Sequence, residues 1–272
     1  MDNRPVGFFD SGLGGLTCIP YFLRAFPEEQ IVYFGDTART PYGSKPPYII
    51  NKFAGEIADF LVQTHDVKMI VLACNTVSSV AADGLRRRCP GIPIVGIIDP
   101  AARAVAGACT EKNRIGVIGT KVTIESGAYQ AGIMNIAPEL KAFAKACPAL
   151  VPLIEENLTC NPVMDLVLKH YLDRFLSENS IDTLVLGCTH YPLIRKNIER
   201  LYGGLRIIDP SEEIISDISN ALTGMEGRIG ENPDHIFYAS DLSENFQNMI
   251  DLIFSGNDYP VKFKNFDLDE IT

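Results

Sequence analysis

Two stretches of this chain, VLACNTVSS at residues 71–79 and VLGCTHYPL at residues 185–193, share one local pattern. Each begins with a valine and a leucine, passes through a small residue to a cysteine, and has a threonine within the next two positions. Short apolar runs that end in polar residues are typical of strands buried on both faces. The repetition predicts two similar α/β halves, with Cys74 and Cys188 at the ends of corresponding strands.

Other apolar runs alternate with segments of helical pattern along the rest of the chain. This alternation favours parallel sheets with crossover helices. We expect strands at residues 6–10, 31–36, 69–74, 92–99, 114–120, 149–154, 183–188 and 205–209. The predicted fold is α/β, with two pseudo-symmetric lobes, each a mainly parallel sheet flanked by helices, and an active site between them.

An Asp-Pro pair follows each cysteine motif, in IVGIIDPAARAV at 94–105 and in LRIIDPSEEIISDI at 205–218. Asp is a preferred N-cap and Pro suits the first helical position, so Asp99 and Asp209 are predicted to start helices where the chain crosses between lobes. The predicted lobes are residues 1–98 with 210–272, and residues 99–209. Two helical stretches and a short tail are expected after Asp209, returning to the first lobe. FFDSGLGG and GVIGTKVTIES are the expected matching first turns.

Composition limits the classes of protein to consider. With 272 residues, 46% of them hydrophobic, the chain can bury a large core. Its formal net charge of −10 disfavours nucleic acid and anionic membranes as partners. An apolar stretch of membrane-spanning length and a signal peptide are both missing from the sequence, so we expect no membrane association and a cytoplasmic location.

The seven cysteines are scattered and odd in number, without a CxxC pair or a nearby histidine at metal-ligand spacing. A disulfide framework and a metal site are therefore not expected, and any functional cysteine acts as a thiol. The cysteines outside the repeated motif lack polar strand-end neighbours and are interpreted as filler in the core or on the surface. These are Cys18, Cys89, Cys109, Cys147 and Cys160.

Polar residues follow most of the predicted strands. Because ligands of open parallel sheets bind at the carboxyl ends of the strands, these residues define one candidate pocket. A single strand-end cysteine is as often structural as catalytic, but its repetition at Cys188 favours function. His190, two residues further on, is a credible partner for proton transfer. The strand-end set is Asp10, Ser11, residues 36–44, Cys74, Asn75, Thr76, Thr120, Thr123, Glu155, Glu156, Cys188, Thr189 and His190.

The motifs FDSGLGG, GDTARTPYGSK, ACNTVSS and GCTHYPL, in this order and spacing, resemble the glutamate racemases over essentially the whole chain. The resemblance implies a cofactor-independent interconversion of L- and D-glutamate, which supplies D-glutamate for peptidoglycan, in a protein that is commonly a homodimer. It implies that Cys74 and Cys188 are the acid/base pair, assisted by Asp10, His190 and one glutamate of PLIEEN. Of Glu155 and Glu156, we favour Glu155. The implied substrate-binding residues are Asp10, Ser11, Tyr42, Gly43, Asn75, Thr76, Thr189 and His190; Thr120 and Thr123 join them as strand-end candidates.

The chemistry of the residues agrees with this resemblance. Inverting a carbon that bears one hydrogen requires a base on one face and an acid on the other. A thiol, with an ordinary pKa of about 8.5, becomes a useful base near an imidazolium or a helix N-terminus. Because the sequence offers no lysine in a pyridoxal-phosphate context, donors of the pocket itself must stabilise the carbanionic transition state.

Three alternatives stay open at this point. A related two-cysteine racemase could act on aspartate or another small acid. The lobes could instead form a non-catalytic protein that binds an acidic metabolite. A dithiol redox protein is the third alternative, and it would need the two sulfur atoms within bonding distance of each other.

Overall fold

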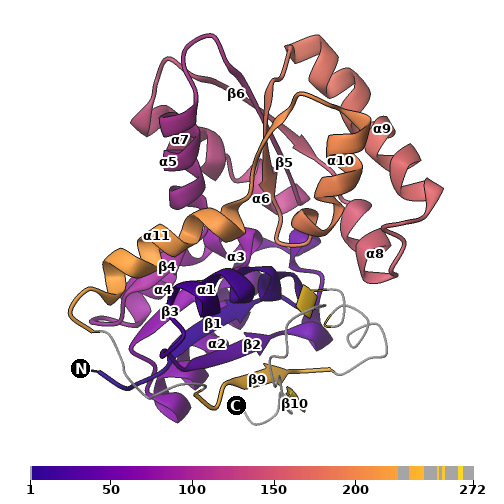
Figure 1. Ribbon diagram of the computed structural model, residues 1–272. Coiled ribbons are helices and arrows are strands. Elements are labelled where there is room, and N and C mark those ends of the chain that lie inside the picture. The colour runs from indigo at the N-terminus through magenta and orange to yellow at the C-terminus, as the bar shows by residue number, and fades with distance from the viewer. Residues whose placement is uncertain (1, 226–232, 242–249, 251–252, 255–262, 266–272) are drawn as a thin grey trace.

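Every strand in the described part of the chain belongs to one of two parallel sheets (Figure 1). The computed structural model describes residues 2–225, 233–241, 250, 253–254 and 263–265. The larger sheet has the order β10-β9-β2-β1-β3-β4 and the smaller one the order β6-β5-β7-β8. The strands are β1 (Val6–Asp10), β2 (Ile31–Gly35), β3 (Met69–Leu72), β4 (Ile94–Gly96), β5 (Arg114–Gly119), β6 (Lys141–Ala146), β7 (Thr183–Gly187), β8 (Arg206–Ile208), β9 (Ile236–Ala239) and β10 (Phe263–Asn265).

The two sheets repeat the same topology. The order β2-β1-β3-β4 corresponds strand for strand to β6-β5-β7-β8. Consequently β3, which leads to Cys74, and β7, which leads to Cys188, occupy equivalent positions. The same holds for β1 and β5, which precede the two turns expected to match. The predicted pair of pseudo-symmetric α/β lobes is confirmed.

Helices cover both sheets and connect the lobes (Figure 1). Helix α11 lies along the boundary between the lobes, where it contacts α5 and β7 as well as α1 and β4. Because α5 and α11 each touch elements of both lobes, the division at residues 98 and 210 stays a prediction. The α-helices are α1 (Ile19–Ala25), α2 (Pro47–His65), α3 (Asn75–Val80), α4 (Ala82–Arg88), α5 (Ile98–Ala108), α6 (Lys121–Glu125), α7 (Ala128–Ile136), α8 (Leu150–Glu155), α9 (Pro162–Asn179), α10 (Arg195–Leu201) and α11 (Pro210–Leu222). The short 3₁₀ turns are η1 (Gly14–Cys18), η2 (Thr37–Arg39), η3 (Tyr42–Ser44) and η4 (Tyr191–Ile194).

The central strands are buried on both faces, as their continuous apolar sequences predict. In β1, Val6 and Phe8 enter one core cluster and Phe9 enters the other, in keeping with the two-residue period of a strand. The first of these clusters continues past Ile218 of α11 to Val117 of β5. A single apolar core therefore joins the two lobes behind the ends of the strands.

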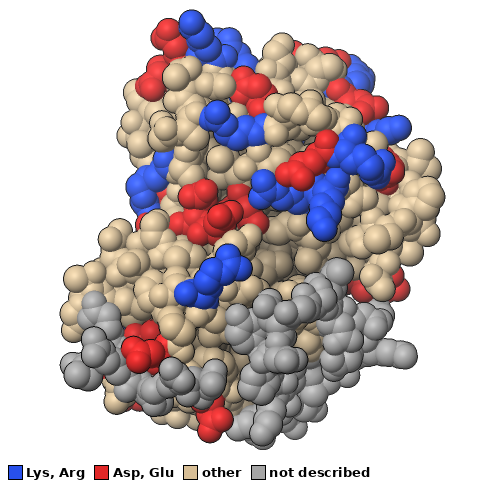
Figure 2. All heavy atoms as spheres, viewed as in Figure 1, with Lys and Arg blue, Asp and Glu red and all other residues tan. Residues whose placement is uncertain are grey.

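The surface carries charges of both signs. On the face shown in Figure 2, lysine and arginine side chains are mixed with aspartate and glutamate rather than gathered into one basic patch. No helix in the described ranges combines the length and the apolar character that crossing a bilayer requires.

One predicted strand is wrong. Residues 149–154 were expected to be extended, but residues 150–154 lie in α8, and the edge strand beside β5 is β6. An apolar run of six residues fits a buried helical turn as well as a strand. The sequence of β6, KAFAKA, is only half buried because β6 is an edge strand, so it lacks the apolar character of the central strands.

The two Asp-Pro pairs also differ. Asp209 caps α11, as predicted, since its side chain accepts a hydrogen bond from the backbone N–H of Ser211. The prediction for Asp99 is wrong, because α5 begins at Ile98 and Asp99 is exposed within its first turn. Strand β9 returns to the first lobe beside β2, so that prediction is confirmed, although β9 and β10 themselves were not expected. Helix α11 is one of the two helical stretches expected here, and the other falls mostly outside the described residues.

Candidate active site

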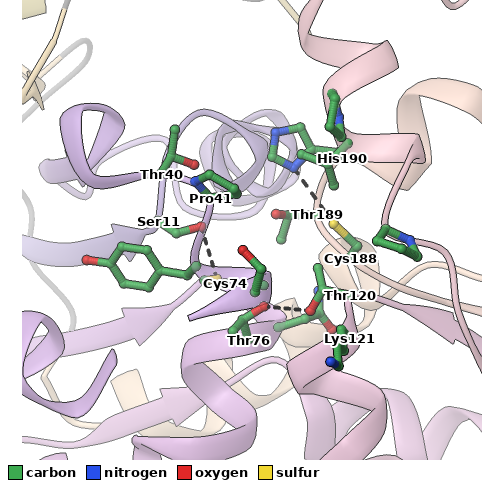
Figure 3. A pocket seen from close by; sticks show the side chains of 17 residues that line it. Ser11, Thr40, Pro41, Cys74, Thr76, Thr120, Lys121, Cys188, Thr189 and His190 are labelled. Atoms are coloured by element: carbon green, nitrogen blue, oxygen red, sulfur yellow. Dashed lines mark hydrogen bonds between the residues drawn. The ribbon is translucent and has the colours of Figure 1, made fainter. Parts of the chain in front are cut away.

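A cavity of about 130 Å³ opens between the carboxyl ends of the strands of both lobes (Figure 3). It is far smaller than the pockets of roughly 300–1,000 Å³ that hold drug-sized ligands, so it suits a small metabolite. Both repeated cysteines line it, one from each lobe. The lining residues are Ser11, Thr40, Pro41, Tyr42, Gly43, Ser44, Cys74, Asn75, Thr76, Thr120, Lys121, Pro148, Val151, Pro152, Cys188, Thr189 and His190.

Cys74 lies two residues after β3 and precedes the first residue of α3. Its side chain is buried, and its thiol donates to the hydroxyl of Ser11 at 3.4 Å. Burial raises the pKa of Cys74 to about 12, with a further contribution from the negative charge of Asp10. This raised pKa favours the protonated thiol.

Cys188 has a different neighbour. Its Sγ lies 3.8 Å from Nδ1 of His190, and Nε2 of His190 lies 3.0 Å from a carboxylate oxygen of Glu155. Burial disfavours the imidazolium, but the hydrogen bonds to Cys188 and Glu155 outweigh it and raise the pKa of His190 well above its usual value. The cation stabilises negative charge on the sulfur of Cys188. Glu155, at the end of α8, makes this contact, whereas Glu156 is exposed.

Asp10 lies behind the cavity wall. It is fully buried and accepts hydrogen bonds from the backbone N–H of Gly12 at 2.8 Å and from the hydroxyl of Thr189 at 3.3 Å. Burial raises the pKa of Asp10, while the charge of His190 and these hydrogen bonds oppose that effect. The carboxylate thus connects the turn after β1 to the loop that carries Cys188.

Two glycines of the FDSGLGG motif allow that approach. A Cβ on Gly14 would lie 2.4 Å from the hydroxyl oxygen of Thr189, and one on Gly15 would lie 2.6 Å from Cβ of Asp10. Both separations are too short for non-bonded atoms. A larger residue at position 14 would force the first turn away from the second lobe, and one at position 15 would displace Asp10.

Asn75 presents an unsatisfied donor at the cavity. Its side-chain oxygen accepts a hydrogen bond from the hydroxyl of Tyr129, while its buried Nδ2 has no hydrogen-bond partner. Leaving a buried donor unpaired costs roughly 1–3 kcal/mol, and an acceptor on a bound ligand would recover that cost.

Three threonines of the predicted site, Thr76, Thr120 and Thr123, form one cluster across the lobes. The hydroxyl of Thr76 lies 3.0 Å from that of Thr120 and 3.3 Å from that of Thr123. Thr120 also caps α6 by accepting from the backbone N–H of Thr123. Thr76 and Thr120 line the cavity, whereas Thr123 supports them from behind.

Tyr42 lines the cavity, but its hydroxyl is used elsewhere. It donates to Asp36, which is not one of the lining residues. A Cβ on Gly43 would lie 2.5 Å from Cβ of Thr120, so the loop containing these two residues closes tightly on the second lobe.

The structure thus brings the predicted residues together, although Asp10, Thr123 and Glu155 support the lining from behind. Several lining residues were not singled out from the sequence. Thr40, Pro41 and Ser44 were covered only by the strand-end range 36–44, and Lys121 stands beside the predicted Thr120. Val151 and Pro152 were missed because residues 149–154 were taken for a strand, and Pro148 stands just before that segment. Among the described residues, no group of three His, Cys, Asp or Glu side chains is arranged to hold a metal ion.

Comparisons with known proteins place the chain in one family. A family model described as Asp/Glu/Hydantoin racemase matches residues 21–217. A glutamate racemase of Geobacter metallireducens is 44% identical over 249 residues, which cover 90% of this chain and 91% of that protein. This chain belongs to the Asp/Glu/hydantoin racemase family.

Solved structures agree over nearly the full length. The crystal structure of glutamate racemase from Francisella tularensis in complex with D-glutamate matches with a TM-score of 0.91 and 34% identity, covering 99% of this chain and 100% of that one. The glutamate racemase from Thermus thermophilus in complex with β-chloro-D-alanine matches with a TM-score of 0.83 and 37% identity, with the same coverage.

Proposed function

We propose that this chain is a glutamate racemase that interconverts L- and D-glutamate by two-base proton transfer between Cys74 and Cys188. One observation carries the proposal: the two cysteines follow equivalent strands of two pseudo-symmetric lobes and line a single small cavity. Such a pair can face the two sides of one substrate carbon. The names of the relatives support glutamate as the substrate.

The substrate is held by groups that already line the cavity. The unpaired Nδ2 of Asn75 and the hydroxyl of Thr76 can donate to a carboxylate, and Thr189 lines the same cavity. Ser11, Tyr42 and Gly43 face the cavity from the first lobe. With one carboxylate held from each side, the α-carbon is confined between the two thiols.

Each reaction then balances one thiolate against one thiol. The thiolate removes the α-proton, the electron pair is delocalised into the α-carboxylate, and the opposite thiol returns a proton on the other face. Hydrogen bonds to that carboxylate strengthen as its charge grows, so the donors of the pocket lower the barrier. No external electron acceptor is needed, and we propose that the reaction requires no cofactor.

The two sulfur atoms have different surroundings. The imidazole of His190, held by Glu155, lies beside the sulfur of Cys188, whereas burial beside Asp10 raises the pKa of Cys74. We propose that Cys188 takes the proton from L-glutamate and that Cys74 takes it from D-glutamate, with His190, Glu155 and Asp10 assisting the proton transfers. Thr120 and Thr123 complete the proposed substrate-binding set by holding Thr76.

Three further statements about the cellular role belong to the proposal. D-Glutamate made by the chain would supply peptidoglycan synthesis, the protein would act in the cytoplasm, and it would form a homodimer. They rest on the family resemblance.

Racemase activity can be tested with the purified chain. Incubated with either enantiomer of glutamate and no added cofactor, it should bring the optical rotation of both solutions to zero. Activity on aspartate but not on glutamate would indicate a racemase of the same family with a different substrate. Binding of glutamate without inversion would indicate a binding protein, and loss of two free thiols on mild oxidation with no inversion would indicate a redox protein.

A further inference from the structure

A buried carboxylate outside the cavity organises the loop that carries Tyr42 and Gly43. Asp36 follows β2, and its side chain is fully buried. Its Oδ2 accepts from the hydroxyl of Tyr42 and from Nε of Arg39 at 2.7 Å, while its Oδ1 accepts from the hydroxyl of Ser240 at 3.0 Å. Removing a carboxylate from water is costly unless hydrogen bonds replace those to water. Because three donors bond the carboxylate of Asp36, moving any of them would leave a buried oxygen less well satisfied, so the donors are held in place.

On its inner side the loop packs on aromatic rings of the first lobe and on Thr120 of the second. The ring of Tyr42 is buried against the rings of Phe9 and Phe53, with centroids 6.5 and 5.7 Å away. Its hydroxyl is committed to Asp36, so the backbone supplies the other polar groups with which Tyr42 can meet a ligand in the cavity. Since Gly43 packs directly on Thr120, a small displacement of the loop changes the cavity wall.

The loop is held on its outer side by the segment that follows β9. The hydroxyl of Ser240 accepts from the backbone N–H of Ala38 at 2.9 Å. The hydroxyl of Thr37 donates to the carbonyl of Asp241 and accepts from its N–H, both at 2.7 Å. These contacts join residues 36–38 to residues about 200 positions later in the chain, and none of the residues that make them lines the cavity.

Arg39 completes the network around Asp36. It bonds Asp36 through Nε and Glu56 of α2 through Nη1 at 2.6 Å, and its guanidinium lies 4.0 Å from the centre of the Phe53 ring. The loop is thus fixed to α2 as well as to β9, and Asp36 is the point where these connections meet.

We propose that Asp36 is a positioning residue for substrate binding, and that Ser240 and Thr37 anchor it from the C-terminal segment. Asp36 holds the backbone of Tyr42 and Gly43 against the substrate without contacting the substrate, and the end of β9 sets how firmly that loop is closed. This inference rests on the proposed function. It predicts effects on substrate affinity rather than on the chemistry at the two thiols.

The main test is Asp36→Asn, which keeps the shape of the side chain but places an amide donor against the existing donors. We expect KM for both enantiomers of glutamate to rise about tenfold while kcat stays within about twofold, since binding energy is lost and the thiols are untouched. Ser240→Ala, which removes one contact, should raise KM about threefold. The matched control is Ser216→Ala. Ser216 is an exposed residue of α11 whose hydroxyl bonds to Glu213 and Asp217 of the same helix. The KM of this variant should equal that of the unaltered chain.

The split between KM and kcat separates positioning from a merely structural role. An unchanged KM in a folded Asp36→Asn protein, or a fall in kcat at constant KM, would overturn the proposal. An equal KM for Ser240→Ala and Ser216→Ala would overturn the anchoring by the C-terminal segment. If Asp36→Asn does not fold, Thr37→Val and Ser240→Ala test the same loop, because each removes hydrogen bonds between the loop and the segment after β9. If the unaltered chain is inactive on glutamate, the proposed function fails, and calorimetry of D-glutamate binding to each variant still tests the positioning.

Discussion

The Nδ1 atom of His190 lies 3.8 Å from the sulfur of Cys188, whereas the thiol of Cys74 donates to the hydroxyl of Ser11. The two halves of the site therefore share a topology but give their cysteines different neighbours. In every turnover one sulfur must act as a thiolate and the other as a thiol. Each catalytic event exchanges their protonation states.

The contact between His190 and Glu155 predicts a change in pH dependence. In Glu155→Gln the carboxylate that stabilises the imidazolium is lost, so the pKa of His190 falls and the cation disappears at lower pH. We expect the alkaline decline of kcat/KM to move to lower pH. Glu156→Gln changes the exposed neighbouring residue and is the matched control, with a profile like that of the unaltered chain. The same shift in both variants, or in neither, would argue against the role of Glu155.

Asp10 is predicted to affect turnover more than binding. Asp10→Asn preserves the shape of a buried side chain and can still accept from the N–H of Gly12, so the fold and much of the substrate affinity should survive. Loss of the charge that tunes proton transfer should lower kcat by about 100-fold, measured from initial rates in both directions. An unchanged kcat would indicate that Asp10 stabilises the turn after β1 and has no part in proton transfer.

Asp209 predicts a pH-dependent stability outside the site. Burial raises the pKa of Asp209 to about 6. Since this folded-state value exceeds the unfolded value of about 4, the folded chain binds the additional proton and its stability falls as the pH rises from about 4 through 6. Asp209→Asn keeps an N-cap without a charge to bury, so it should raise the free energy of unfolding at neutral pH by about 1–2 kcal/mol.

The difference should vanish below about pH 4, where the aspartate is protonated in both states. Urea unfolding at several pH values measures it. The control is Asp99→Asn at the corresponding position of the repeat, where the side chain is exposed and the change should stay within about 0.5 kcal/mol. Equal stability of Asp209→Asn and the unaltered chain at neutral pH would contradict the interpretation.

Cofactor independence is a separate prediction. Racemase activity should be retained in full after exhaustive dialysis against a chelator and after treatment with carbonyl reagents, because the proposed chemistry uses only side chains of the chain itself. Assays before and after treatment measure this. Activity that is lost and then restored by a divalent metal or by pyridoxal phosphate would overturn the assignment.

The sequence predicted the parts of the fold and site that depend on local pattern. Central strands such as β3 and β7 are buried on both faces and therefore apolar throughout, and the polar residues at their ends had to converge. Edge strand β6 lacks that apolar signature, and helix α8 shares it, so both were misassigned. Asp99 looks like Asp209 in sequence, but only the structure reveals that α5 starts two residues earlier relative to its Asp-Pro pair than α11 does.

The contacts that depend on distant segments were beyond local pattern. The hydrogen bonds of Asp36 with Ser240 and of Asp10 with Thr189 join residues about 200 and about 180 positions apart. The sequence did not show which of Glu155 and Glu156 contacts His190. Adjacent residues of a helix point in different directions, and the structure shows that Glu155 is the one directed at His190.

The central claim is that Cys74 and Cys188 serve opposite faces of one substrate carbon, and the most direct measurement uses Cys→Ser variants with glutamate analogues that carry a leaving group on the β-carbon. Elimination from such an analogue needs only the base that removes the α-proton, whereas racemisation needs both thiols. We expect both variants to lose racemisation in both directions, Cys188→Ser to retain elimination from the D-configured analogue, and Cys74→Ser to retain it from the L-configured one. Equal loss of both eliminations in both variants would contradict the two-base account, and the opposite preference would show that the two faces are assigned the wrong way round.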